Sequence, residues 1–160
     1  MSHQLSVLDE LLAKAEKRYC QKIDPQVLLQ ARLFPDMFAL IKQVQIATDM
    51  SKGAAARLAN VEIPRYEDNE VTFADLHARL RKCIDFISSL SEEQFAGAES
   101  RSIQLKVGSY DLSFNGDNYV TQWVLPNVFF HITTAYNILR HNGVELGKKD
   151  FLGKLNNLGV

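Results

Sequence analysis

Four segments of this chain carry apolar side chains at the three- and four-residue spacing of an amphipathic helix. The first segment ends near Gln21, the second runs from Pro35 to Asn60, the third follows Thr72, and the last ends before Gly143. Each apolar stripe has to be buried against its neighbours, so the pattern predicts an all-α fold, a bundle of four helices. The period does not choose between bundle topologies, and the long links on either side of the third helix allow crossover connections.

Proline and short polar residues predict where two of these helices begin. Pro35 and Asp36 suit a helix N-terminus, because proline is tolerated in the first turn and a carboxylate interacts favourably with the positive end of the dipole. We therefore expect the second helix to begin there. Thr72 and Asp75 have the spacing of a capping box, which predicts the start of the third helix.

The last helix is the most apolar of the four. We expect Asp117 or Asn118 to cap it, and Pro126 to remove one backbone hydrogen bond and bend it. The segment that follows this helix contains several glycines and asparagines. Phe151 and Leu152 are the apolar residues predicted to anchor this tail on the body of the protein.

Residues 103–114 change from the helical period to strict alternation, which predicts a β-hairpin. Gly108 and Ser109 fit a two-residue type II′ turn between the strands. That turn sets the register, in which three apolar pairs share one face: Val107 with Tyr110, Leu105 with Leu112, and Ile103 with Phe114. Two strands alone are marginal in water, so this apolar face is expected to pack onto the helices.

Length, charge and cysteine content narrow the class of protein. A chain of 160 residues fits one domain, residues 1–160, and a formal net charge of −1 gives no electrostatic footprint for nucleic acid or an anionic membrane. No apolar run is long enough to span a bilayer, and the first residues lack the pattern of a signal peptide. Cys20 and Cys83 have no metal or redox spacing. These features predict a cytoplasmic protein without nucleic-acid or membrane partners.

Six motifs stand out along the chain: Arg32–Phe38, Gln43–Ala47, Ala56–Leu58, Pro126–His131, Ala135–Val144 and Gly147–Phe151. Together they resemble a bacterial family defined as a domain of unknown function, which belongs to the DinB/YfiT-like superfamily of metalloenzymes. The resemblance covers nearly the whole chain. It implies a DinB-like four-helix bundle that is often dimeric, and superfamily relatives include thiol-dependent transferases and a mycothiol-dependent isomerase.

Metal-binding members of that superfamily hold a divalent ion with one histidine of the second helix and a His-x-x-x-His pair of the fourth. This chain departs from the pattern, because His131 matches the first histidine of the pair but Ala135 stands in place of the second. Residues 35–60 contain no histidine. The ligand set for a divalent metal is therefore incomplete: His131 is the only matched ligand, although Asp36 or Asp49 could replace a missing histidine and would favour a harder metal.

A polar stripe on the last helix is the candidate pocket. Asn127, His131 and Thr134 share one face of the helix by their spacing. In the simpler interpretation, His131 is a buried histidine satisfied by neighbouring groups. In the functional one it acts as a general base or hydrogen-bond donor to a small ligand. The complete set of candidate residues is His131, Asn127, Thr134, Trp123, Tyr136, Gln43 and Asp49.

Three hypotheses about function follow. The first is a DinB-like bundle without the three-histidine site and without an assigned cofactor, which binds a small ligand near His131. The resemblance and the small residues Gly53–Ala56 further predict that it forms a homodimer. The alternative is a metal- or thiol-dependent transferase or hydrolase with a modified site. A third class, an interaction protein, would expose an apolar patch.

Overall fold

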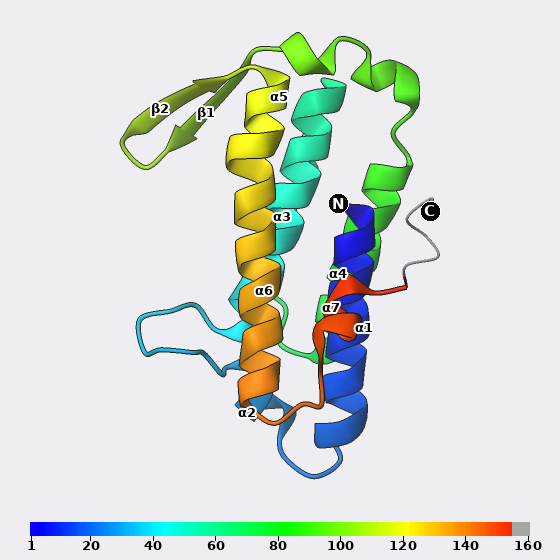
Figure 1. Cartoon of the computed structure of the whole chain (residues 1–160), viewed down its shortest axis with the longest axis vertical. Helices are drawn as coiled ribbons and strands as arrows, with labels where there is room; N and C mark the ends of the chain where they lie inside the picture. Colours follow the sequence, from blue (N-terminus) through cyan, green and yellow to red (C-terminus); the bar gives the residue numbers. More distant parts are fainter. Residues whose placement is uncertain (155–160) are drawn as a thin grey trace.

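The computed structural model describes residues 1–154, which form a bundle of four long helices (Figure 1). The predicted all-α bundle is confirmed. Within it, α3 packs against α4 and α6, and α1 packs against both of these from the other side. The long helices are α1 (Ser2–Tyr19), α3 (Leu40–Ala59), α4 (Phe73–Ser88) and α6 (Leu125–His141). The short helices are α2 (Pro25–Leu29), the 3-10 turns η1 (Glu92–Phe95) and η2 (Ala98–Ser100), and α7 (Lys148–Leu152).

The apolar stripes of the four long helices meet in one continuous core. Leu8 and Leu12 of α1, Leu76 of α4, and Ile132 and Ile138 of α6 are completely buried. Burying a side chain of this size stabilises the fold by roughly 1.5–3 kcal/mol each. Within residues 1–154, no helix is both long and apolar enough to cross a membrane.

The link between α3 and α4, residues 60–72, runs back along the bundle, so that α3 and α4 point in the same direction (Figure 1). Side chains of α3 hold it at successive points: Lys42 bonds to Asp68 at 2.5 Å, and Gln45 bonds to Glu70 at 2.8 Å. At its end the link meets α2, where Gln26 donates to the carbonyl of Val71. The crossover that the sequence allowed is therefore present on this side of α4.

The second long helix begins later than predicted. It starts at Leu40, and the residues from Pro35 onward form turns before it. The backbone N–H of Leu40 donates to the carbonyl of Ala31 at 3.0 Å, which closes residues 32–39 into a loop. Pro35 thus lies in a loop. The hydrogen bond between Ala31 and Leu40 outweighs the preference of Pro35 and Asp36 for the first turn of a helix.

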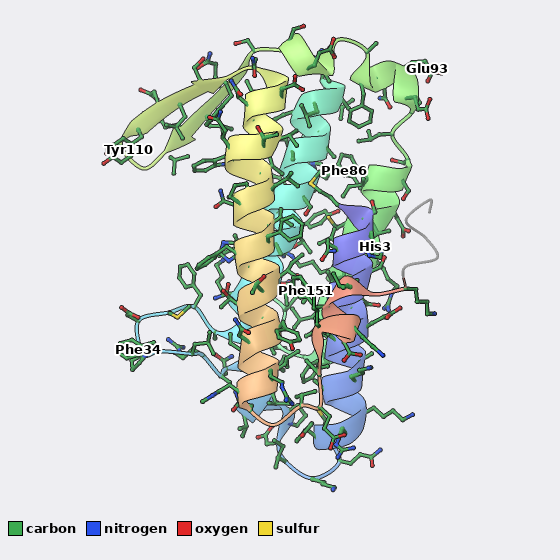
Figure 2. All side chains as sticks on the ribbon, viewed as in Figure 1. His3, Phe34, Phe86, Glu93, Tyr110 and Phe151 are labelled. Atoms are coloured by element: carbon green, nitrogen blue, oxygen red, sulfur yellow. The ribbon has the colours of Figure 1, made fainter. Side chains whose placement is uncertain are left out.

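The hairpin has the predicted register in β1 (Ile103–Val107) and β2 (Tyr110–Phe114). Its packing differs from the prediction. Ile103 is buried at the base, but Tyr110 is 70% exposed and Val107 is also exposed. The tip projects away from the helices, as Figure 2 shows for Tyr110. Only the base of the apolar face packs on the bundle, because the strands project sideways and away from the helices that would cover it (Figure 1).

The last long helix is built from three consecutive pieces that continue as one rod (Figure 1). They are α5 (Gly116–Asn118), the π-helical turn η3 (Tyr119–Val124) and α6. The predicted cap was wrong by two residues or more, since Asn115 supplies it by accepting from the N–H of Asn118. Pro126 falls in the first turn of α6, where its missing N–H is tolerated. The widened turn precedes it, with the N–H of Leu125 donating to Val120, five residues back.

Phe151 packs edge-on against Tyr136, so the predicted anchoring of the tail on the bundle is confirmed for Phe151. The side chain of Leu152 is exposed, and this residue is held instead through its carbonyl, which accepts from His3. The small-residue segment Gly53–Ala56 is buried within the helical bundle, where small side chains let neighbouring helices approach closely.

Candidate functional site

His131 lies on the side of α6 that faces α3. It is only 9% exposed, and the ring of Phe130 meets its imidazole edge-on with centroids 5.2 Å apart. Phe130 itself is 57% exposed. His131 therefore lies at the boundary between the core and the surface, where part of the ring can be reached from outside.

Gln43 of α3 determines which ring nitrogen of His131 carries the proton. Its Nε2 donates to the carbonyl of Phe38 at 3.0 Å, and its Oε1 lies 2.7 Å from His131 Nδ1. A carbonyl can only accept, so the first bond fixes the orientation of the amide and turns its oxygen towards the imidazole. His131 Nδ1 must then be the donor, which leaves Nε2 without a proton in the neutral ring.

The free nitrogen of His131 can act on another molecule. Nε2 has no hydrogen-bond partner among residues 1–154, and it is not sealed off from solvent in that part of the chain. Burial lowers the pKa of His131 below its ordinary value, so the ring is neutral at about pH 7. A neutral imidazole with an unprotonated Nε2 can accept a hydrogen bond or a proton from a small molecule.

Three of the predicted pocket residues are engaged elsewhere. Thr134 Oγ1 donates to a backbone carbonyl of its own helix at 2.7 Å. Asn127 Nδ2 donates to the backbone carbonyl of Trp123, in the π-helical turn, at 2.7 Å. Tyr136 packs against the aromatic ring of α7. Of the predicted set, only Gln43 forms a hydrogen bond with His131.

Asp49 belongs to a different group of residues, centred on Arg79 of α4. The guanidinium of Arg79 is buried, with its side chain 2% exposed, and it donates to Thr48 Oγ1 at 2.7 Å and to Asp49 Oδ1 at 2.7 Å. It also contacts Asp68 at 3.1 Å and Glu70 at 2.9 Å, both in the link that precedes α4. We call these five residues the Arg79 cluster.

The charges of the Arg79 cluster are balanced within the protein. Lys52 bonds to Asp49 at 2.5 Å and also lies over the ring of Tyr66, 4.3 Å from its centroid. Lys42 pairs with Asp68. Arg79 and these two lysines thus match the three carboxylates of the cluster. We interpret the Arg79 cluster as a structural ion-pair network that holds the crossover link against α3 and α4, rather than as a ligand site.

The sequence analysis missed Arg79. The available signal was its position, because it follows Leu76 by three residues and precedes Cys83 by four, within the apolar stripe of α4. An arginine on the inner face of a helix requires acidic partners, and the acidic link directly before the helix supplies them. Cys83, which lies on the same face, has its pKa raised to about 12 by burial, so its thiol is not a nucleophile.

Trp123 lines a cleft of about 300 Å³ between α3, β1 and the π-helical turn. Asp49 reaches the same cleft from α3. Four of the seven predicted candidate residues therefore lie in two separate places: His131 with Gln43, and Trp123 with Asp49 at the cleft nearer the hairpin.

Comparison with protein families matches residues 1–152 to a single family model, described as a domain of unknown function, DUF1993. The chain belongs to the DUF1993 family. This finding confirms the resemblance of the sequence motifs to such a family.

A solved structure supports the same placement of this DUF1993 protein. It is the crystal structure of a DinB family member protein from Shewanella denitrificans, which is 42% identical and superposes with a TM-score of 0.86. The match covers 96% of this chain and 87% of the other. No curated protein matches the chain. The fold is therefore that of the DinB-like superfamily.

The residues around His131 of this DUF1993 protein do not fit a three-histidine metal site. The α3 side chain that contacts His131 is an amide, Gln43, and the residue one turn further along α6 is the completely buried Ala135. Among residues 1–154, no group of three or more histidine, cysteine or acidic side chains is arranged so that it could hold a metal ion. An amide oxygen and one imidazole are a poor ligand set for zinc, which prefers thiolate and imidazole donors.

Proposed function

We propose that this DUF1993 protein binds a small ligand at His131 and does so without the three-histidine metal site of the DinB-like superfamily. The orientation of Gln43 carries the proposal. Its amide is bonded at both ends within the protein, to Phe38 and to His131 Nδ1, so it holds the imidazole with Nε2 outward. A fixed tautomer with a free acceptor is typical of a histidine that acts on a ligand.

The surroundings of Nε2 define the kind of ligand. The neutral ring is an acceptor, so the ligand must donate an O–H or N–H group. The ring of Phe130 meets the imidazole edge-on and is exposed, so it offers aromatic surface to a flat apolar group. The ligand class that fits is a small, neutral, apolar molecule with one hydroxyl or amine donor.

Phenol is a suitable probe because it combines a hydroxyl donor with a flat ring. We expect phenol to shift the Nε2 resonance of His131 saturably in protein with ¹⁵N-labelled histidine, and we expect Phe130→Ala to weaken the effect. Thr133→Ala, which changes an exposed residue of the same helix, is the matched control. Shifts of equal size at His3 and His141, or no saturable shift at His131, would show that this site binds no such ligand.

The alternative function is a metal- or thiol-dependent transferase or hydrolase with a modified site. The free Nε2 of His131 favours it too, because the same atom could act as a general base or as one metal ligand. Zinc titration separates the two proposals. Stoichiometric zinc binding that disappears in His131→Ala would favour the metal-dependent alternative and would overturn the metal-free one.

We also propose that the protein forms a homodimer. Gly53–Ala56 no longer supports this, since the segment is buried within the chain. Support comes from the aromatic ends of two projections on the same side of the bundle, Phe34 (64% exposed) and Tyr110 (Figure 2). Covering such side chains favours association.

Sedimentation velocity tests the dimer. We expect the wild-type protein to sediment as a dimer and the Phe34→Ser/Tyr110→Ser double variant to shift towards monomer. The matched control is Ser113→Ala, at an exposed position of the same hairpin. A wild-type monomer at micromolar concentration would contradict the proposal.

A further inference from the structure

Three structural elements, α3, β1 and the π-helical turn η3, contribute the residues that line this cleft. Arg57 lies on α3, Leu105 and Lys106 on β1, and Tyr119 and Trp123 on η3. Its volume of about 300 Å³ is at the lower end of the range for small-molecule pockets. Widened π-helical turns are frequent at functional sites, and here the turn provides both aromatic side chains of the cleft.

Arg57 is a charged residue of this cleft that has no ion-pair partner among residues 1–154. Its guanidinium donates to the hydroxyl of Tyr119 at 3.2 Å, and no carboxylate among residues 1–154 forms an ion pair with it. A guanidinium has five N–H donors, so most of its hydrogen-bonding capacity is unused here. This contrasts with Arg79, which donates to the Arg79 cluster and to the backbone carbonyls of Glu67 and Gln45.

Gly53 leaves space for the Arg57 side chain. A Cβ atom at Gly53 would lie 2.7 Å from Arg57 Nη1, so a larger residue there would displace the guanidinium from its present position along α3. The bond to the Tyr119 hydroxyl keeps the guanidinium next to η3. Such fixed placement reduces the entropy lost when a ligand binds.

The other charges near the cleft leave it cationic. Asp49 is the one carboxylate that lines the cleft, and it already bonds to Arg79 and Lys52. Lys106 adds a second cation at the hairpin rim. The apolar parts of the wall include the indole of Trp123 and the side chains of Leu105 and Met50, which suit a flat apolar group.

We propose that this cleft binds a small organic anion that carries a flat apolar group. The acid group pairs with the guanidinium of Arg57, whose planar fork matches both carboxylate and phosphate oxygens. The apolar group lies against Trp123. This site is separate from His131, which is two turns further along α6.

Trp123 provides a direct reporter, because it is the only tryptophan of the chain. The probes are phenylacetate and phenyl phosphate, with neutral phenylacetamide as the comparison. We expect both anions to change the tryptophan emission saturably and to bind at least about ten-fold more tightly than the amide, as expected for a charge-assisted hydrogen bond. The tighter of the two anions identifies the acid group. Equal binding of the amide, or no saturable change with either anion, would overturn the proposal.

Two variants test the role of Arg57 in different ways. Arg57→Gln removes the charge and is expected to weaken anion binding at least about ten-fold. Gly53→Ala keeps the charge but displaces the guanidinium, and alanine is the better helix former, so loss of binding in this variant cannot come from loss of the helix. Arg81→Gln, at an exposed position of α4, is the control for net charge.

The outcomes separate this proposal from the ligand site at His131. Anion binding that survives in both Arg57→Gln and Gly53→Ala would contradict the role of Arg57. His131→Ala should keep the anion response of Trp123, since the two sites share no residue. Loss of the phenol response at His131 alone would leave the cleft proposal intact.

Discussion

A single amide sets the chemistry of the polar face around His131 inside this bundle. Gln43 is the residue of α3 that contacts His131. Its uncharged amide orients the ring but does not stabilise the protonated imidazolium as a carboxylate would. A carboxylate in the same place would stabilise the protonated ring and raise its pKa. The neutral state of His131 therefore follows from one residue choice together with burial.

His77 and His131 are expected to have pKa values shifted in opposite directions from the ordinary value. His77 lies 2.5 Å from Asp9, and this hydrogen bond raises the pKa of His77, whereas burial lowers the pKa of His131. An NMR titration of labelled histidine should place His77 above and His131 below the value of an unfolded chain, about 6.5. A titration with the two in the reverse order would contradict both contacts.

These shifts fix the pH dependence of stability. The contribution of His77 is present below the unfolded pKa and is lost as the pH rises through its raised folded pKa. His131 acts oppositely: as the pH falls below the unfolded pKa, the unfolded chain takes up the proton first and stability decreases. Urea unfolding should therefore show a larger destabilisation by His77→Gln at about pH 5 than at about pH 8.

Arg79 is the residue whose replacement should damage the fold most. Arg79→Met would leave the nearly buried Glu70 without its cation, and breaking a buried ion pair in this way costs about 3–5 kcal/mol. Asp49 and Asp68 are about 40% exposed and keep Lys52 and Lys42, so they add little to this loss. Urea denaturation measures the loss, with Arg81→Met at an exposed position as the control. A loss for Arg79→Met no larger than that of the control would show that the cluster does not fasten the link.

At the scale of elements, local chemistry decided which predictions held. The hairpin register followed from the sequence because its turn and its alternation agree on one pairing. The capping box at Thr72 was equally local and is present. The start of α3 depended instead on a backbone bond between Ala31 and Leu40, residues whose contact no propensity encodes.

Gly116 shows how tightly the elements join at the start of the last helix. A Cβ atom there would lie 1.7 Å from the carbonyl oxygen of Ala98, so the backbone of η2 would have to move. We expect Gly116→Ala to destabilise the protein by about 1–3 kcal/mol in thermal or urea unfolding. Gly147→Ala, where a Cβ has only one neighbour at 4.0 Å, is the matched control. Equal stability of the two variants would contradict this close packing.

At the scale of the molecule, the sequence predicted the bundle but only part of the candidate site. Helical periodicity placed His131 on an inner face, yet it could not assign Gln43 as its partner, because the angular placement of α3 relative to α6 is set by packing. The periodicity also grouped Asp49 with His131, although Asp49 forms an ion pair with Arg79. Contacts across a bundle depend on both helices at once, and a stripe on one helix describes only half of each contact.

At the scale of the whole molecule, the central claim is that Gln43 and Ala135 leave this DinB-like bundle without a three-histidine metal site. Zinc titration by calorimetry, on protein purified without chelator or metal resin, tests it most directly. The Gln43→His/Ala135→His variant is the positive comparison, because it restores the histidines that the resemblance implies. The account predicts no stoichiometric zinc in the wild-type protein and binding in the double variant. Stoichiometric zinc in the wild type that is lost in His131→Ala would contradict it.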